Sequence, residues 1–149
     1  YGSLKYGDLS PQRIKNYVFD WDKMISFDGN TAPYIQYAHA RICSILSKVD
    51  GEFKQMEIEN FEHSSERNLA KKLVQYPNVI KECLATYEPH KICTYLFSLS
   101  QSFTSFYENC NISKSEGLSR QLRLNLAIQT KDILEEGLYL LGIEAPERM

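Results

Sequence analysis

The sequence predicts an all-α protein, a helical bundle of about five or six helices. Two observations carry this prediction. Apolar residues recur at intervals of three and four over most of the 149 residues, which is the spacing of one helix face. Beyond the first few residues, no segment shows strongly the alternation of apolar and polar residues that predicts a strand. Proline, glycine and serine residues separate the helical stretches from one another.

The first residues of the chain are its least regular part. Residues 1–8 are polar and interrupted by glycine, and a strand without its sheet partners is one interpretation of them. Ser10 followed by Pro11 is typical of an N-cap and a first helical position, so we expect a short helix that ends near Phe19. Residues 21–28 contain four large apolar side chains, and their spacing leaves both a short helix and an extended segment open.

A helix from about residue 32 to residue 49 has the most informative pattern. Gly29 and Asn30 break the preceding element. Thr31 is placed to cap the helix, and Pro33 suits its first turn. At about 100° per residue, one arc collects the apolar positions Ile35, Ala38, Ile42, Ile45, Leu46 and Val49. A neighbouring, narrower arc collects Tyr34, Tyr37, Arg41 and Lys48.

This second arc gives the helix a flank with two phenol rings and a guanidinium group. Aromatic faces stack on unpaired bases, and a guanidinium group can stack or bond a base edge or a phosphate. The same residues also fit a core margin of two tyrosines beside a solvated arginine, and geometry alone favours that plainer interpretation. The pattern therefore predicts a surface and leaves its ligand open.

The middle of the chain predicts an acidic loop and two helices. Residues 51–65 are polar and acidic, which indicates a loop and a poor surface for RNA. Ser64 or Ser65 is placed to cap the next helix, and we expect that helix to end at Pro77. A separate short helix follows and closes before Pro89.

Two long helices complete the predicted bundle. One spans about residues 89–109, and Tyr107 lies near its end, beside the core stripe. The stripe has 4-3-4-3-4 spacing and consists of Ile92, Leu96, Leu99, Phe103, Phe106 and Cys110. On geometry alone Tyr107 is a core-edge aromatic with its hydroxyl in water. The last helix spans about residues 118–141, and Gly142 is placed to be its left-handed C-cap.

Composition and charge exclude several classes of protein. The formal net charge is −2, so a non-specific binder of polyanions is not expected. The four cysteines show no C-x-x-C pairing, which argues against a metal site or a disulfide framework. We find no activated nucleophile and no glycine-rich phosphate loop, and we expect no catalytic residue here. Without a signal peptide or a long apolar run, the expected location is the cytoplasm, away from membranes.

Several unusual strings follow one another along the chain. The first are YVFDWDKM (residues 17–24), GNTAPY (29–34) and YAHAR (37–41). HKICTYL (90–96) and FYENC (106–110) follow, and LLGIEAPERM (140–149) closes the chain. In this order, the strings resemble class I arginyl-tRNA synthetases where the catalytic core joins the anticodon-binding domain. The resemblance implies that residues 1–20 are the end of the catalytic domain or a connector, and that residues 21–149 are the α-helical anticodon-binding domain.

The resemblance also implies site residues. Residues of the family that lie around the anticodon loop match Tyr34, Tyr37, Arg41, Tyr107 and Met149. A tail turned by Gly142 and Pro146 would bring Met149 back to this surface. The middle cytosine of the anticodon is the natural candidate for the base that is read.

The implied function is recognition of the tRNA(Arg) anticodon loop during protein biosynthesis, by a domain of an aminoacyl-tRNA synthetase. The parent enzyme, an arginine–tRNA ligase, would use ATP and magnesium at a catalytic domain absent from this chain. Neither nucleotide-binding signature of a class I synthetase occurs here, so the chain resembles a fragment that is not itself catalytic, holds no cofactor and is a monomer. The alternative is a stand-alone helical protein-interaction module, because tyrosine and arginine are common interface anchors.

Overall fold

A computed structural model describes residues 1–12, 20–49, 51–58 and 60–149, and these residues form six helices and no strand. The helices are α1 (Gly2–Leu9), α2 (Trp21–Met24), α3 (Ala32–Leu46), α4 (Ser64–Thr86), α5 (His90–Asn109) and α6 (Gly117–Leu140). The predicted all-α class is therefore confirmed. None of these helices is long and apolar enough to cross a membrane.

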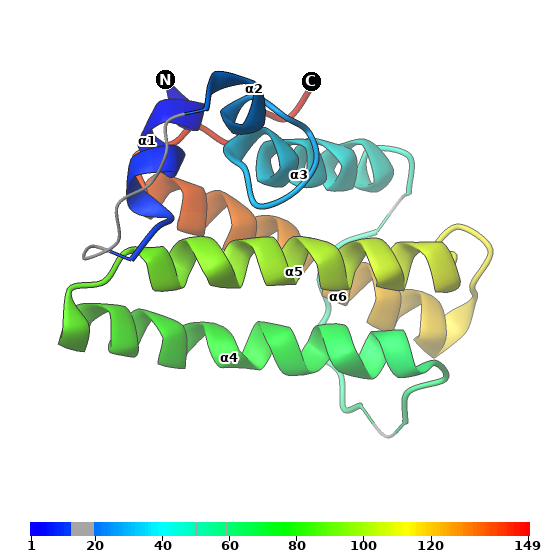
Figure 1. Cartoon of the computed structure of the whole chain (residues 1–149). Helices are drawn as coiled ribbons and strands as arrows, with labels where there is room; N and C mark the ends of the chain where they lie inside the picture. The colour runs from blue at the N-terminus through cyan, green and yellow to red at the C-terminus, as the bar shows by residue number, and fades with distance from the viewer. Residues whose placement is uncertain (13–19, 50, 59) are drawn as a thin grey trace.

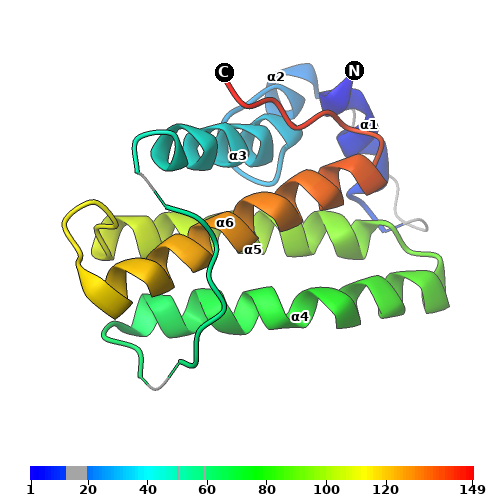
Figure 2. The same cartoon turned by 180° about the vertical axis from the view of Figure 1, so that it is seen from behind.

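The helices form a bundle in which α4 and α5 lie side by side along their lengths (Figure 1). Helix α6 packs against both of them, and α3 lies across α5 and α6 on the side away from α4 (Figure 2). Helices α1 and α2 lie beside the first turns of α3. Both ends of the chain therefore lie on the α3 side of the molecule.

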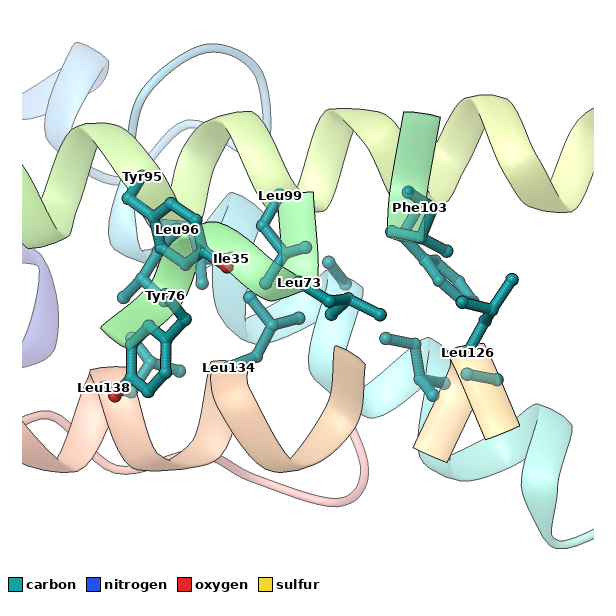
Figure 3. Packing of buried hydrophobic residues seen from close by; sticks show 14 of the residues in the cluster. Ile35, Leu73, Tyr76, Tyr95, Leu96, Leu99, Phe103, Leu126, Leu134 and Leu138 are labelled. Carbon is teal, nitrogen blue, oxygen red and sulfur yellow. The ribbon is translucent and has the colours of Figure 1, made fainter. Parts of the chain in front are cut away.

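The core lies where α3, α4, α5 and α6 meet (Figure 3). All six residues of the stripe predicted on α5 are buried, and Leu96, Leu99 and Phe106 have no exposed surface at all. Leu134 and Leu138 face them from α6, and both are also fully buried. Burial of one such side chain stabilises the fold by about 1.5–3 kcal/mol, so these contacts hold α5 and α6 together.

Gly137 of α6 allows this helix to approach α5 closely. A Cβ atom at this position would lie 2.5 Å from Leu96 Cδ2 and 3.0 Å from Leu96 Cδ1. Because Leu96 is fully buried, it has little room to move. We expect Gly137→Ala to lower the free energy of unfolding by roughly 1–2 kcal/mol, since overpacking outweighs the better helix propensity of alanine.

Urea denaturation measures this change, and Leu96→Ala provides the control. In the Leu96→Ala background the clash is removed, so Gly137→Ala should be neutral or stabilising there. The same destabilisation in both backgrounds would show that close packing against Leu96 is not the reason for the glycine.

The N-terminal segment corrects two expectations. Residues 2–9 form helix α1 and not a strand, and Ser10 is the C-cap of this helix, where we expected the N-cap of another. Most of the helix expected after Ser10, at residues 13–19, lies outside the described residues. Helix α1 is stabilised by the contacts of Tyr6. This side chain is 1% exposed, and its hydroxyl donates a hydrogen bond to the Cys93 carbonyl at 2.9 Å. This contact with α5 overrides a local sequence that is poor in helix signals.

The segment after residue 20 contains one turn of helix. Asp20 caps α2 by accepting a hydrogen bond from the Lys23 amide at 3.2 Å. This settles the choice between a helix and an extended segment for residues 21–24. Trp21 is half exposed, so it does not belong to the core of this chain.

Helix α4 continues through Pro77, where we expected one helix to end and another to follow. Proline removes one amide donor and crowds the preceding turn. The Leu73 carbonyl, four residues before Pro77, is the one that loses its donor. Next to it, the Lys72 carbonyl accepts a hydrogen bond from the Tyr95 hydroxyl at 2.8 Å. Packing against α5, which follows α4 over its length, therefore stabilises the helix across the proline.

The start of α4 also differs slightly from the prediction. Its N-cap is His63, one residue before the expected serines. The His63 ring nitrogen Nδ1 accepts a hydrogen bond from the Ser65 amide at 3.2 Å, and Glu66 accepts one from the His63 amide at 3.1 Å. This reciprocal arrangement is a capping box.

Candidate nucleic-acid interface

Helix α3 begins at the predicted residues and buries the predicted face. The Thr31 hydroxyl accepts a hydrogen bond from the Tyr34 amide at 3.3 Å, and Pro33 occupies the first turn. Ile35 and Ile42 are fully buried against the bundle. The rest of the stripe predicted on this helix is buried or partly buried. The neighbouring flank consequently points away from the centre of the core.

Arg41 on this flank is held by an aromatic ring of α5. Its guanidinium carbon lies 4.9 Å from the centroid of the Tyr107 ring. The Tyr107 ring in turn stacks on Phe103, with centroids 6.2 Å apart and planes 16° from parallel. A cation over an aromatic face is attracted by about 0.5–1 kcal/mol at such a site. Arg41 is therefore an oriented group, and not the freely solvated charge of the plainer interpretation.

The two tyrosines of the flank have different surroundings. Tyr34 packs against Phe97 of α5, with ring centroids 5.4 Å apart, and is partly buried. Tyr37 is 48% exposed and makes a T-shaped contact with Phe27, with centroids 6.2 Å apart and planes at 83°. Tyr34 thus packs between α3 and α5, while about half of the Tyr37 side chain stays exposed.

The segment after α6 brings the end of the chain back to this flank. Gly142 has φ +68, and the amides of Gly142 and Ile143 donate to the carbonyls of Tyr139 and Leu138 at 2.8 and 2.9 Å. This is the Schellman arrangement, so the predicted C-cap is confirmed. Residues 143–149, which we call the tail, then pass beside α3 (Figure 2).

A groove of about 590 Å³ lies between α3 and the last three residues of the tail. It is lined by Tyr37, Ala40, Arg41, Cys43, Ser44, Ser47, Glu147, Arg148 and Met149. The structure therefore brings together three of the predicted site residues, and the Arg41–Tyr107 contact adds a fourth. Tyr34, the fifth, lies one turn along α3 and outside the lining. A groove of this volume suits a small molecule or an unstacked base.

The lining combines aromatic, apolar, hydroxyl and charged groups. Burial raises the pKa of the Cys43 thiol, so this side chain lines the groove as a neutral group near pH 7. Arg41 and Arg148 carry positive charge at the groove and Glu147 carries negative charge. The groove therefore does not carry a strong positive charge.

Sequence reasoning missed Phe27 and the polar residues of the lining. Phe27 lies in the loop before α3 and is 57% exposed. An aromatic residue four places before the helix cap was the available signal. Ser44 and Ser47 lie one and two turns beyond Arg41, but serines on an exposed helix face are too common to single out. Over the described part of the chain, no three His, Cys, Asp or Glu side chains are grouped to hold a metal ion.

The all-α bundle that carries this groove matches a known family of domains. Residues 35–149 match the family model described as the DALR anticodon binding domain. The chain therefore belongs to the DALR anticodon binding domain family, which confirms the resemblance found in the sequence. This membership does not favour the alternative of a stand-alone interaction module.

Curated relatives of the chain are named arginine–tRNA ligase. The relative from Frankia casuarinae is 46% identical over 148 residues, which are 99% of this chain and 25% of that protein. The relative from Proteus mirabilis is 45% identical over 150 residues, 99% of this chain and 26% of that protein. The chain thus spans about a quarter of the length of these relatives.

Solved structures show the same architecture. The arginyl-tRNA synthetase of Thermus thermophilus matches with a TM-score of 0.91 and 32% identity, over 99% of this chain and 26% of that one. The arginyl-tRNA synthetase of Plasmodium falciparum matches with a TM-score of 0.87 and 31% identity, over the same shares of both chains.

Proposed function

We propose that this chain is the anticodon-recognition domain of an arginyl-tRNA synthetase, and that its groove receives unstacked bases of the tRNA(Arg) anticodon loop. The observation that carries the proposal is the convergence of three side chains from two distant parts of the sequence, helix α3 and the tail. Tyr37, Arg41 and Met149 meet at one groove, and Arg41 is oriented there by Tyr107.

Each residue has a distinct role in this proposal. Tyr37 provides a stacking face, worth about 1–3 kcal/mol for one base. Arg41 bonds a base edge or a nearby phosphate, and its planar group suits paired hydrogen bonds. Met149 adds an apolar contact. Tyr107 orients Arg41, and Tyr34 holds helix α3 against α5, each through its ring contacts.

The parent protein would join arginine to tRNA(Arg) with ATP and magnesium at a catalytic domain that precedes this one. Residues 1–20 would be the end of that domain or the connector, and residues 21–149 the recognition domain. Recognition here contributes no chemistry, but it uses binding energy to position the distant acceptor end of the tRNA. The proposed setting is a cytoplasmic monomer.

A titration against an anticodon stem-loop tests the proposal. We expect the chain to prefer the arginine anticodon loop over a copy whose middle cytosine is replaced. Loss of one stacked base predicts that Tyr37→Ala weakens binding of the native loop by about 5- to 150-fold. Tyr139→Ala is the matched control, because Tyr139 is 79% exposed and lies outside the groove lining. Equal affinity of the wild-type chain for both loops would contradict the proposal.

A further inference from the structure

The tail has little burial of its own to hold it in place. Ile143 is 4% exposed and anchors its first residue. Lys5 of α1 also donates a hydrogen bond to the Gly142 carbonyl. Ala145 packs against the core, but Glu147, Arg148 and Met149, which line the groove, are all exposed. Something other than apolar contact must therefore set the course of the tail beyond Ala145.

Two side chains of α3 bind the backbone of the tail directly. Gln36 Nε2 donates to the Glu144 carbonyl at 2.7 Å. The His39 ring nitrogen Nδ1 lies 2.9 Å from the Pro146 carbonyl. Gln36 and His39 are three residues apart, so both lie on one face of α3. They bond alternate carbonyls of the tail and leave its side chains free to face the groove.

The surroundings of His39 determine which ring nitrogen carries its hydrogen. Its side chain is 1% exposed. Because a carbonyl oxygen only accepts, Nδ1 must donate to Pro146. The other ring nitrogen, Nε2, lies 3.8 Å from the Cys43 sulfur, and in the neutral ring it is the acceptor. His39 is thus fixed as a donor at the point where the tail turns toward the groove.

We propose that Gln36 and His39 are positioning residues that set the RNA specificity of the groove through the tail. Neither of them lines the groove. By binding the carbonyls of Glu144 and Pro146, they hold Arg148 and Met149 where a ligand meets them. A tail that was already ordered would lose less conformational entropy on binding, which raises affinity. The RNA part of this inference rests on the function proposed above.

Three variants distinguish loss of the two hydrogen bonds to the tail from loss of stability of the fold. Gln36→Glu keeps the shape of the side chain but turns a carboxylate toward a carbonyl oxygen, at a partly exposed position. His39→Leu removes the donor. His39→Asn keeps an amide nitrogen close to the position of Nδ1, so it should restore the bond. Gln75→Glu makes the same charge change at an exposed position on α4, and serves as the control.

Two measurements are made on each variant of the 149-residue chain. The first is the NMR order parameter of the Glu147 and Arg148 amides without RNA. We expect about 0.85 in the wild type and less than about 0.6 in Gln36→Glu and His39→Leu. The second is the affinity for the native stem-loop, which should fall about tenfold in the same two variants, together with the preference over the altered loop.

His39→Asn should return both quantities toward the wild type, and Gln75→Glu should change neither. Loss of RNA affinity in His39→Leu without a change in the tail amides would overturn the inference, because the residue would then act through stability alone. A released tail with unchanged affinity and preference would overturn it as well. If the wild-type chain shows no preference for the native loop, the proposed function fails. The order parameters then still decide whether these two residues hold the tail.

Discussion

Glu66→Gln is expected to lower the free energy of unfolding by about 3 kcal/mol, because it removes one partner of a buried ion pair. Glu66 is fully buried. Its Oε1 accepts a hydrogen bond from Arg123 Nε at 2.7 Å, and its Oε2 accepts one from the Glu62 amide at 2.8 Å. Arg123 is only 14% exposed. A glutamine would turn its own NH₂ group toward one of these donors. It would also leave Arg123 with only its exposed ion-pair partner, Glu62, whose Oε2 lies 2.9 Å from Arg123 Nη2.

The same variant should change how stability depends on pH. Burial on its own raises the pKa of Glu66, but the hydrogen bonds from Arg123 and from the His63 and Glu62 amides outweigh it and hold this pKa below its usual value. The stabilising charge is therefore fully present above the pKa of the unfolded state, about 4.3. It is lost as the pH falls through the lower pKa of the folded state.

Urea denaturation at a series of pH values between about 3 and 7 measures both effects. The wild-type chain should lose stability on acidification through this range, and Glu66→Gln should lose less. Glu82→Gln, at an exposed position of the same helix, controls for the amide substitution. Parallel pH profiles for wild type and Glu66→Gln would show that the Glu66–Arg123 pair is not a source of the acid sensitivity.

Arg41→Ala is expected to weaken binding of the arginine anticodon stem-loop by about 10- to 100-fold. Hydrogen bonds to a charged group are stronger than neutral ones, and the Tyr107 ring holds this guanidinium group in one orientation. The fold should be unaffected, since Arg41 is only partly buried and its contact with Tyr107 lies at the edge of the bundle. Fluorescence titration of the labelled stem-loop measures the change.

Arg41→Lys distinguishes the two contacts that Arg41 can make. A lysine keeps the charge but loses the planar fork, so it should recover only a small part of the affinity if the group bonds a base edge. Full recovery with an unchanged salt dependence would identify a phosphate contact instead. Arg67→Ala, an exposed arginine on α4, is the control. Wild-type affinity in Arg41→Ala would remove Arg41 from the site.

The sequence by itself determined the helical class, the buried faces of α3 and α5 and the C-cap at Gly142. These features depend on residues within a few positions of one another, so periodicity and capping residues are sufficient to predict them. The resemblance to arginyl-tRNA synthetases also came from the sequence. It named five site residues, of which the structure gathers four around one groove.

Only the tertiary structure decided the features that depend on contacts between distant segments. Helix α4 continues through Pro77, and five residues before it the Lys72 carbonyl accepts a hydrogen bond from Tyr95 of α5. Helix α1 forms where Tyr6 is buried and bonded to the Cys93 carbonyl. The course of the tail depends on His39 meeting a carbonyl 107 residues later in the chain. The energies of such contacts depend on which segments the fold brings together, and this pairing of distant segments cannot be predicted from local sequence patterns.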